Sequence, residues 1–283
     1  MKRIRFLYIS ALLLTVTAAN AVLWGQTPTT AEDFYNRGCA YFKNGDYDSA
    51  IEDFTKVTWF LPNNPIPYYN RGVAYGCKGE YDIAILDYTE AIRLNPNFAE
   101  AYNNRGNAYT SKGEYNRAIA DLTQAIQISP DKTEAYVNRG NAYDFRGDHD
   151  IAIEDYNKAI RLNPNYAKAY FERSIAYSNK KDYDSEIADL TQAIRIIPNY
   201  ADAYNNRGAA YSKKNDYDSA IADYTQAIRL NPNYADYYNN RGYMYIIKGD
   251  YDKAIADFEA TLRINPNHAK AKANLEAARK RGK

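Results

Sequence analysis

The chain has few of the residues from which catalytic and metal sites are built. It contains two cysteines and two histidines. His149 and His268 stand far apart, and neither lies at a metal-ligand spacing from other candidate ligands. No glycine-rich phosphate-binding loop or nucleophile motif occurs. We therefore expect no enzymatic activity, no metal, no cofactor and no small-molecule substrate, and we interpret His149 as a packing substitute.

An excess of one charge is also missing. The 36 basic residues nearly balance the 35 acidic ones. Both ends of the chain have an excess of basic residues, so that residues 31–268 carry a net charge of about −7. A body of this sign repels phosphate backbones, which argues against a nucleic-acid partner. The 30 tyrosines are accordingly interpreted as packing residues rather than as platforms for bases.

No apolar run is long enough to span a bilayer comfortably. The longest, Phe6 to Ala18, follows a basic start and precedes the small residues Ala19-Asn20-Ala21. This layout is typical of a secretory signal peptide. We predict a signal peptide at residues 1–21, a linker at 22–30 and export, most simply to a bacterial periplasm or cell envelope. Cleavage near Gly25 and an uncleaved anchor are the alternatives.

What the chain does have is a repeat. Prolines recur every 34 residues, at Pro62, Pro96, Pro130, Pro164, Pro198, Pro232 and Pro266. A period in this range indicates a solenoid of small units that cannot bury their apolar faces alone. In the third unit, one helical pattern ends at Gly113, and a second runs from Tyr115 to Ile128 before Pro130. Each unit is therefore predicted to be an antiparallel helix hairpin.

Equivalent positions of the repeats, here called columns, explain how each hairpin closes. One column of the first helix is glycine in six repeats, at Gly38, Gly72, Gly106, Gly140, Gly208 and Gly242. One column of the second helix is alanine, at Ala50, Ala84, Ala118, Ala152, Ala220 and Ala254. Glycine inside a helix costs about 1 kcal/mol relative to alanine. Its recurrence predicts that the two helices approach closely there.

These columns, together with the recurring Tyr, Ala and Pro, resemble the tetratricopeptide repeat (TPR) family. The resemblance covers Ala31 to His268 in seven repeats, 31–64, 65–98, 99–132, 133–166, 167–200, 201–234 and 235–268. It implies an all-α, right-handed superhelical solenoid of seven antiparallel helix hairpins, with residues 269–283 as a basic C-terminal capping helix. The apolar Ala271, Leu275 and Ala278 should face the seventh repeat.

Two columns of opposite charge accompany the glycines and alanines. The arginines are Arg37, Arg71, Arg105, Arg139, Arg173, Arg207 and Arg241, and the aspartates are Asp53, Asp87, Asp121, Asp155, Asp189, Asp223 and Asp257. We predict a structural ladder of arginine–carboxylate contacts between the helices of each hairpin.

Repeat 5 departs from the pattern. Ser174 replaces the glycine, Glu186 the close-packed alanine and Lys181 the helix-ending glycine. A carboxylate at this place must find a partner or shift outward. We expect Glu186 to reach Ser174 or a lysine, and the alternative is a flexible joint.

The two cysteines, Cys39 and Cys77, occupy different columns on the first helices of neighbouring repeats. An exported protein could oxidise them. Packed helices lie about 8–10 Å apart, however, and a disulfide needs Cα atoms within about 7 Å. We therefore favour two free thiols on the ligand-facing side.

In TPR proteins the exposed columns of the first helices contact the ligand, and the resemblance predicts a concave peptide-binding groove here. A column of asparagines crosses this groove. Amide side chains can donate to and accept from any peptide backbone. The column resembles the asparagine ladder of the O-linked GlcNAc transferase repeats. The predicted groove residues are Asn36, Asn70, Asn104, Asn138, Asn206 and Asn240, the polar Asn103, Asn107 and Asn141, and the apolar Tyr35, Phe42 and Tyr69. The alternative is that the asparagines bond only neighbouring helices or water.

The functional prediction is a protein-interaction scaffold that binds an extended polypeptide in this groove, in cell-envelope assembly. The alternative is a structural protein that self-associates or docks membrane complexes through its ends and outer face. The basic clamp that binds the C-terminal carboxylates of heat-shock chaperones in the TPR family does not carry over, since Tyr35, Tyr69 and Val137 occupy the corresponding places. The basic C-terminal helix offers a peripheral membrane contact.

Overall fold

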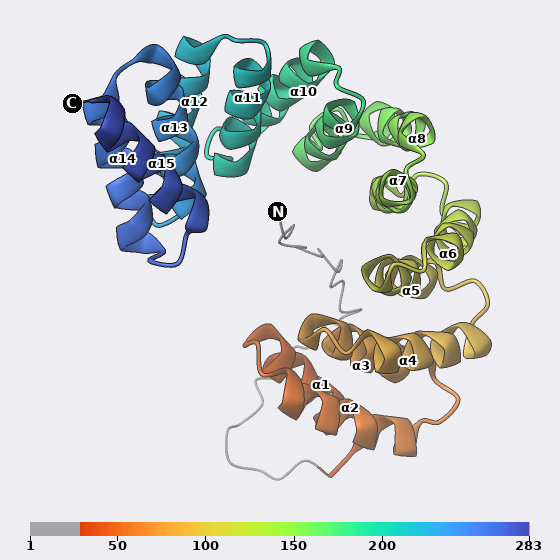
Figure 1. Ribbon diagram of the computed structural model, residues 1–283. Coiled ribbons are helices and arrows are strands. Elements are labelled where there is room, and N and C mark those ends of the chain that lie inside the picture. Colours follow the sequence, from red (N-terminus) through yellow and green to blue (C-terminus); the bar gives the residue numbers. More distant parts are fainter. Residues whose placement is uncertain (1–28, 283) are drawn as a thin grey trace. The chain divides into compact units, whose positions relative to one another are not determined.

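The computed structural model describes residues 29–282, and this part of the chain is built from helices and short connections, without a strand (Figure 1). The helices are α1 (Ala31–Lys43), α2 (Tyr47–Phe60), α3 (Pro65–Lys78), α4 (Tyr81–Leu94), α5 (Ala99–Lys112), α6 (Tyr115–Ile128), α7 (Thr133–Arg146), α8 (His149–Leu162), α9 (Ala167–Asn179), α10 (Tyr183–Ile196), α11 (Ala201–Lys213), α12 (Tyr217–Leu230), α13 (Ala235–Lys248), α14 (Tyr251–Ile264) and α15 (Ala269–Arg281). The expected all-α fold of helix hairpins with a last helix is confirmed.

The predicted signal peptide lies outside the described residues. Within residues 29–282 no helix is both long and apolar enough to cross a membrane.

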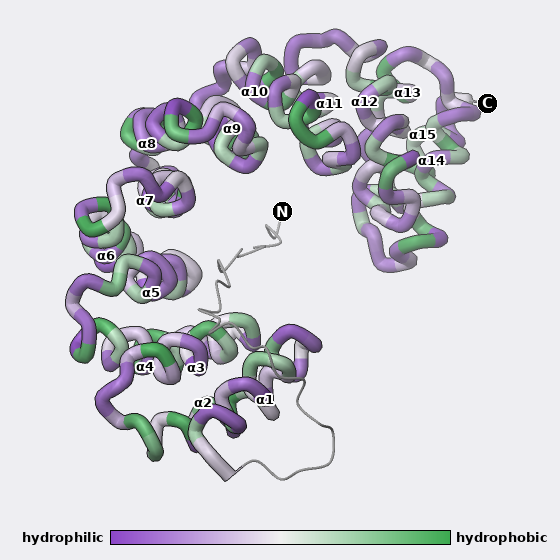
Figure 2. Tube along the Cα trace, turned by 180° about the vertical axis from the view of Figure 1, so that it is seen from behind, coloured by the Kyte–Doolittle hydropathy of each residue, from purple (hydrophilic) through white to green (hydrophobic). Residues whose placement is uncertain are grey.

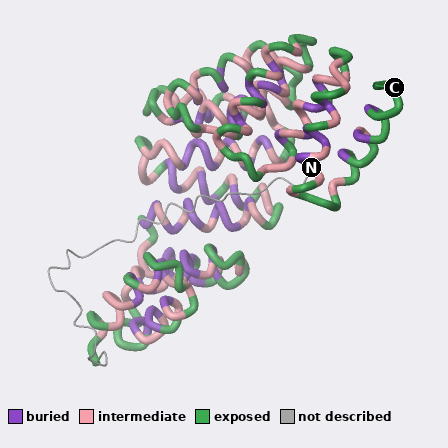
Figure 3. Tube along the Cα trace, turned by 90° about the vertical axis from the view of Figure 1, so that its left-hand side faces the viewer, coloured by how far each residue is buried: buried purple, intermediate pink, exposed green. Residues whose placement is uncertain are grey.

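The chain divides into two compact units within α8, after Asp155. In the first unit α1 packs on α2, α3 on α4 and α5 on α6, and the pairs are joined by contacts of α2 with α3, α4 with α5 and α6 with α7. The second unit repeats this scheme from α9 to α15. Figure 3 shows buried residues on the faces between adjacent helices and exposed residues in the connections. The core of each unit is therefore a series of layers between consecutive helices.

Helix ends follow the local sequence. The connection after each first helix contains one residue with a positive φ between 62° and 101°, in the same column of all seven repeats: Gly45, Gly79, Gly113, Gly147, Lys181, Asn215 and Gly249. Glycine adopts this left-handed conformation without strain, which explains five of the seven residues. The connections are largely hydrophilic (Figure 2), as expected for exposed backbone.

The glycine column is confirmed as a point of close approach. A Cβ on Gly72 would lie 2.8 Å from Cε1 of Tyr88, and one on Gly106 would lie 2.6 Å from Cγ of Leu122. Ala84 and Ala118, in the facing column, are fully buried. Any larger residue at the glycine positions must displace a core side chain of the second helix.

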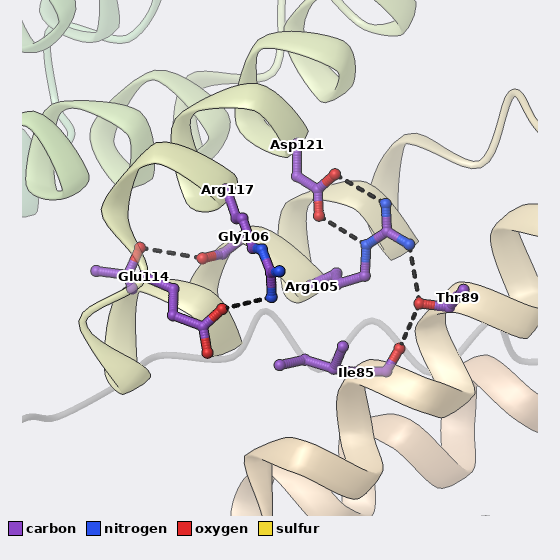
Figure 4. Close-up of polar contacts among 8 residues, drawn as sticks. Ile85, Thr89, Arg105, Gly106, Glu114, Arg117 and Asp121 are labelled. Atoms are coloured by element: carbon purple, nitrogen blue, oxygen red, sulfur yellow. Dashed lines mark hydrogen bonds and ion pairs between the residues drawn. The ribbon is translucent and has the colours of Figure 1, made fainter.

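The arginine–aspartate ladder is also confirmed and connects more than the two helices of one hairpin. Arg105 donates from Nε and Nη2 to the two carboxylate oxygens of Asp121, at 2.7 and 2.8 Å (Figure 4). Its Nη1 donates to Oγ1 of Thr89 in the preceding repeat, at 2.9 Å. All seven arginines make the bidentate contact. Each guanidinium thus fixes its own hairpin, and in repeats 2 to 7 it also holds the hairpin to the one before.

In repeat 5 the expected partner of Glu186 is wrong. Ser174 donates instead to the backbone oxygen of Phe171, at 2.6 Å, and Glu186 is hydrogen-bonded by Ser178. Glu186 is only 5% exposed, and its Oε2 has no hydrogen-bond partner among the described residues. Burial raises the pKa of this carboxyl to about 7. The small hydroxyl of Ser174 finds an acceptor on its own helix, so it does not reach across to the carboxylate.

Candidate protein-binding face

The first helices of consecutive repeats contact one another within each unit, α3 with α5 and α5 with α7 in the first unit, α11 with α13 and α13 with α15 in the second. The asparagine column lies at these contacts. Asn70 donates to the hydroxyl of Tyr35, and Asn104 to the hydroxyl of Tyr69, both at 3.0 Å. Asn138 donates to Oδ1 of Asn103 at 2.9 Å. In each case the amide bonds the residue 35 positions earlier, on the preceding first helix.

The prediction that these asparagines face solvent is therefore wrong in the middle of the first unit. Asn70, Asn104 and Asn138 are 0%, 2% and 6% exposed. Their amides hold neighbouring first helices together, which is the alternative that the sequence left open. Asn36, Asn206 and Asn240 are half-buried, and Asn240 makes the equivalent bond, to Oδ1 of Asn205 at 3.1 Å.

The apolar groove residues predicted in the first two repeats lie mostly in the core. Tyr69 is fully buried and Phe42 is 9% exposed, and both belong to the cluster that joins the first two hairpins. Tyr35 is half-buried beside it, and burial raises the pKa of its phenol to about 12. Cys39 is buried and Cys77 exposed, and both are free. The buried side chains pack the fold and cannot contact a ligand without rearrangement.

The polar centre predicted in repeats 3 and 4 is largely closed as well. Asn103 is fully buried and Asn107 is 5% exposed, whereas Asn141 is half-buried. Nδ2 of Asn107 has no hydrogen-bond partner among the described residues. His149 stands in a tyrosine column, as predicted, and its Nδ1 lies 2.6 Å from Oδ1 of Asp144.

An exposed face on first helices does exist, in the second unit. Tyr243 is 49% and Ile247 41% exposed, one turn apart on α13. The column of Ile247 places Lys213 on α11 and Arg281 on α15, the two helices that flank α13. Both cations are exposed, and neither forms an ion pair with another described residue. We call these four residues the α13 face: an apolar strip between two free positive charges.

The α13 face is not among the predicted groove residues, because outside the asparagine column these came only from repeats 1 to 4. The two columns of the α13 face contain Tyr243 and Ile247 in repeat 7, where repeat 3 has Asn107 and Ser111. Large apolar residues in columns that are polar elsewhere are the signal that could have identified it.

The last helix packs as predicted. Ala271 and Ala278 are fully buried and Leu275 is 9% exposed, all against α14. An open cleft of about 530 Å³ lies between α14 and α15, lined by Ile255 and Leu262 among others. Lys272 and Arg279 also line it.

Comparison with known families places the chain. Family models described as tetratricopeptide repeat match residues 31–64, 133–166, 201–234 and 235–268, and also 155–188. A model described as TPR repeat matches residues 77–111 and 106–144. The chain belongs to the tetratricopeptide repeat family. No curated protein sequence matches it.

Solved TPR structures are similar to the chain. A tetratricopeptide repeat protein from Parabacteroides merdae ATCC 43184 superposes with a TM-score of 0.66 at 23% identity, covering 88% of this chain and 98% of that one. A chain of the APC/C hetero-tetramer Cut9–Hcn1 superposes with a TM-score of 0.69 at 20% identity. The match covers 89% of this chain but only 49% of that one. YrrB, described as a TPR protein with an unusual peptide-binding site, superposes with a TM-score of 0.54 at 23% identity, covering 66% of this chain and 96% of that one. These likenesses establish the fold.

As a TPR protein, the chain is a protein-interaction scaffold of a generally non-enzymatic family. No group of three or more candidate ligands within residues 29–282 could hold a metal ion. The described helices offer a partner apolar side chains such as Tyr243 and Ile247, together with amides and charged groups.

Proposed function

We propose that this TPR scaffold binds an extended polypeptide through the α13 face. The observation that carries the proposal is the exposure of Tyr243 and Ile247 between two cations that lack partners among the described residues. Exposed aromatic and aliphatic anchors on a rigid helix are typical of binding hot spots. Lys213 and Arg281 favour a ligand whose apolar residue is flanked by acidic ones. The half-buried Asn240 and Asn206 are the members of the asparagine column closest to this face in sequence.

A displayed library of random 12-residue peptides tests this proposal without a known partner. Selected peptides should share a large apolar residue with nearby Asp or Glu. The double change Tyr243→Ala and Ile247→Ala should weaken their binding at least about tenfold, since it removes two apolar anchors. The matched control is Ile83→Ala with Leu86→Ala, an exposed apolar pair on α4. Peptides that bind both double variants equally well would place the site elsewhere.

We further propose that the scaffold is exported and acts in the cell envelope. The support is the layout of residues 1–21, with a basic start, an apolar run and a small-residue end. N-terminal sequencing of envelope-localised protein should begin near Val22. Recovery of the Met1 terminus on a membrane-embedded form would show that the segment is kept as an anchor.

The alternative function, self-association through the ends or outer face, is supported by exposed apolar residues outside the α13 face. Ile83 and Leu86 are 42% and 69% exposed on α4. Light scattering over a hundredfold concentration range separates the two functions. A monomer that loses peptide binding on change of the α13 face supports a scaffold for extended polypeptides, whereas concentration-dependent assembly lost on change of Ile83 and Leu86 supports self-association.

A further inference from the structure

The end of the first hairpin carries an apolar tip. Trp59, Phe60 and Leu61 are consecutive and are 74%, 53% and 42% exposed. Three large apolar side chains in a row form a contiguous exposed patch, whereas single exposed apolar residues need no explanation. The same columns hold Arg-Leu-Asn in repeats 2, 4 and 6, so that an arginine stands there in the column of Trp59 and an asparagine in the column of Leu61. The tip is therefore a property of repeat 1 and not of the repeat plan.

The tip lies beside the point where the chain enters the first helix. The ring of Phe60 stacks on Phe34 of α1, with 6.0 Å between their centroids. Phe34 is one turn from Thr30, the N-cap of α1. The apolar run Phe6 to Ala18 ends only 12 residues before Thr30, which limits their separation to roughly 40 Å even for a fully extended chain.

We propose that the tip formed by Trp59, Phe60 and Leu61 inserts into the interface of a lipid bilayer. This proposal rests on the alternative in which residues 1–21 are kept as an anchor, and the tip is then a second membrane contact beside the N-terminal apolar segment. Tryptophan and other aromatic rings favour the level of the lipid headgroups, because one part of the ring system is apolar and another is polar. A single weak apolar anchor binds membranes only marginally, and a second contact makes the attachment stable.

The charges near the tip indicate that apolar insertion, and not attraction to anionic lipid, drives the contact. Glu32 and Asp33 are exposed in the first turn of α1. Lys56 and Arg37 both lie over the ring of Phe34, with Nζ of Lys56 4.9 Å and Cζ of Arg37 5.7 Å from its centroid. Both form ion pairs with Asp53. The surroundings are thus not basic, in contrast to α15. Binding through the tip should need no anionic lipid and should persist in high salt.

The two tryptophans of the chain allow a direct test. In the full chain, Trp24→Phe leaves Trp59 as the only tryptophan. It is added to phosphatidylcholine vesicles that contain brominated phosphatidylcholine, which quenches tryptophan at the level of the interface. Trp59 emission should shift to the blue and be quenched, to the same extent when phosphatidylglycerol is included.

The matched control moves the reporter to the same column of repeat 6. The variant Trp24→Phe, Trp59→Arg, Arg229→Trp should stay unquenched, because Arg229 is an exposed residue far along the sequence from the tip. A transplant of the residues of repeats 2, 4 and 6, Trp59→Arg with Phe60→Leu and Leu61→Asn, should reduce vesicle binding at least about tenfold while leaving the melting temperature nearly unchanged.

Three outcomes would overturn the proposal. Trp59 could remain unquenched on chains that float with the vesicles. Association could require phosphatidylglycerol and disappear in high salt, which would place the membrane contact on basic residues, either in α15 or at the start of the chain. Alternatively, light scattering could reveal dimers that the transplant abolishes, which would assign the tip to a second copy of the chain.

Discussion

Repeats 5 and 6 are neighbours in the second unit and share one plan, yet their helices meet in different ways. In repeat 6, Gly208 lies so close to Tyr224 that a Cβ would be 3.0 Å from the ring, and Ala220 is fully buried. In repeat 5, Ser174 and Glu186 occupy these two columns and are 1% and 5% exposed. A dry contact of small residues has been replaced by two polar groups.

The difference shows which contacts the hairpin needs. Repeat 5 keeps the bidentate contact of Arg173 with Asp189 and a fully buried Leu190 in the column of Tyr224. The hairpin therefore forms with one unfavourable contact, because the remaining contacts fix both helices. Part of the cost is the ionisation of a buried carboxyl group, and this part depends on pH.

The largest effect is expected when the carboxylate of repeat 5 is placed in repeat 6. Ala220→Glu buries a carboxylate at a fully buried position, beside a contact that Gly208 and Tyr224 already fill, so we expect a loss of about 3–4 kcal/mol in the free energy of unfolding at pH 8. Urea unfolding measures it. Ala222→Glu, on the exposed side of the same helix, is the control and should change little. Equal losses in both variants would show that the close contact is not the cause.

The second prediction concerns the pH dependence of repeat 5. The folded pKa of Glu186, about 7, lies above its ordinary value of 4.5, so the folded state binds the proton more tightly. The resulting stability is fully present below pH 4.5 and is lost as the pH rises through 7. Glu186→Gln should therefore be nearly neutral at pH 4.5 and stabilising by about 2–3 kcal/mol at pH 8. Glu154→Gln, at an exposed position, should show no such difference, and a gain for Glu186→Gln that is the same at both pH values would contradict the explanation.

A third, smaller effect separates the buried from the half-buried asparagines. Asn104 is 2% exposed, donates to Tyr69 and accepts from Asn103, so Asn104→Ala should cost about 1–2 kcal/mol. Asn206 is half-buried, and Asn206→Ala should cost less than about 0.5 kcal/mol. Thermal unfolding of both variants checks this. Equal melting temperatures would mean that the amide bonds between first helices do not contribute to stability.

The 34-residue period predicts the helices, the close contact at Gly106 and the pairing of Arg105 with Asp121, because these depend on contacts within one hairpin. It does not predict whether a groove column is buried. The burial of a groove column depends on how closely consecutive first helices pack. Within one column Asn104 is buried, whereas Asn206 is half-buried. Nor does it give the third contact of Arg105, with Thr89, since this requires the placement of the next hairpin. The α13 face could have been predicted from its columns.

The smallest effect concerns the turn of repeats 5 and 6. Lys181 and Asn215 have φ values of 62° and 63° in a column that is otherwise glycine. A Cβ in the left-handed region costs about 1 kcal/mol for most residues, but asparagine tolerates it because its short side chain bonds locally. Glycine also makes the unfolded chain more flexible, which offsets part of the gain. We therefore expect Lys181→Gly to stabilise the protein by about 0.5 kcal/mol and Asn215→Gly to change it little, whereas Gly249→Ala, at φ 80°, should destabilise it by about 1 kcal/mol. Urea unfolding at pH 5, where Glu186 is protonated, keeps this comparison separate from the carboxylate, and a larger gain at Asn215 than at Lys181 would contradict the role assigned to the asparagine side chain.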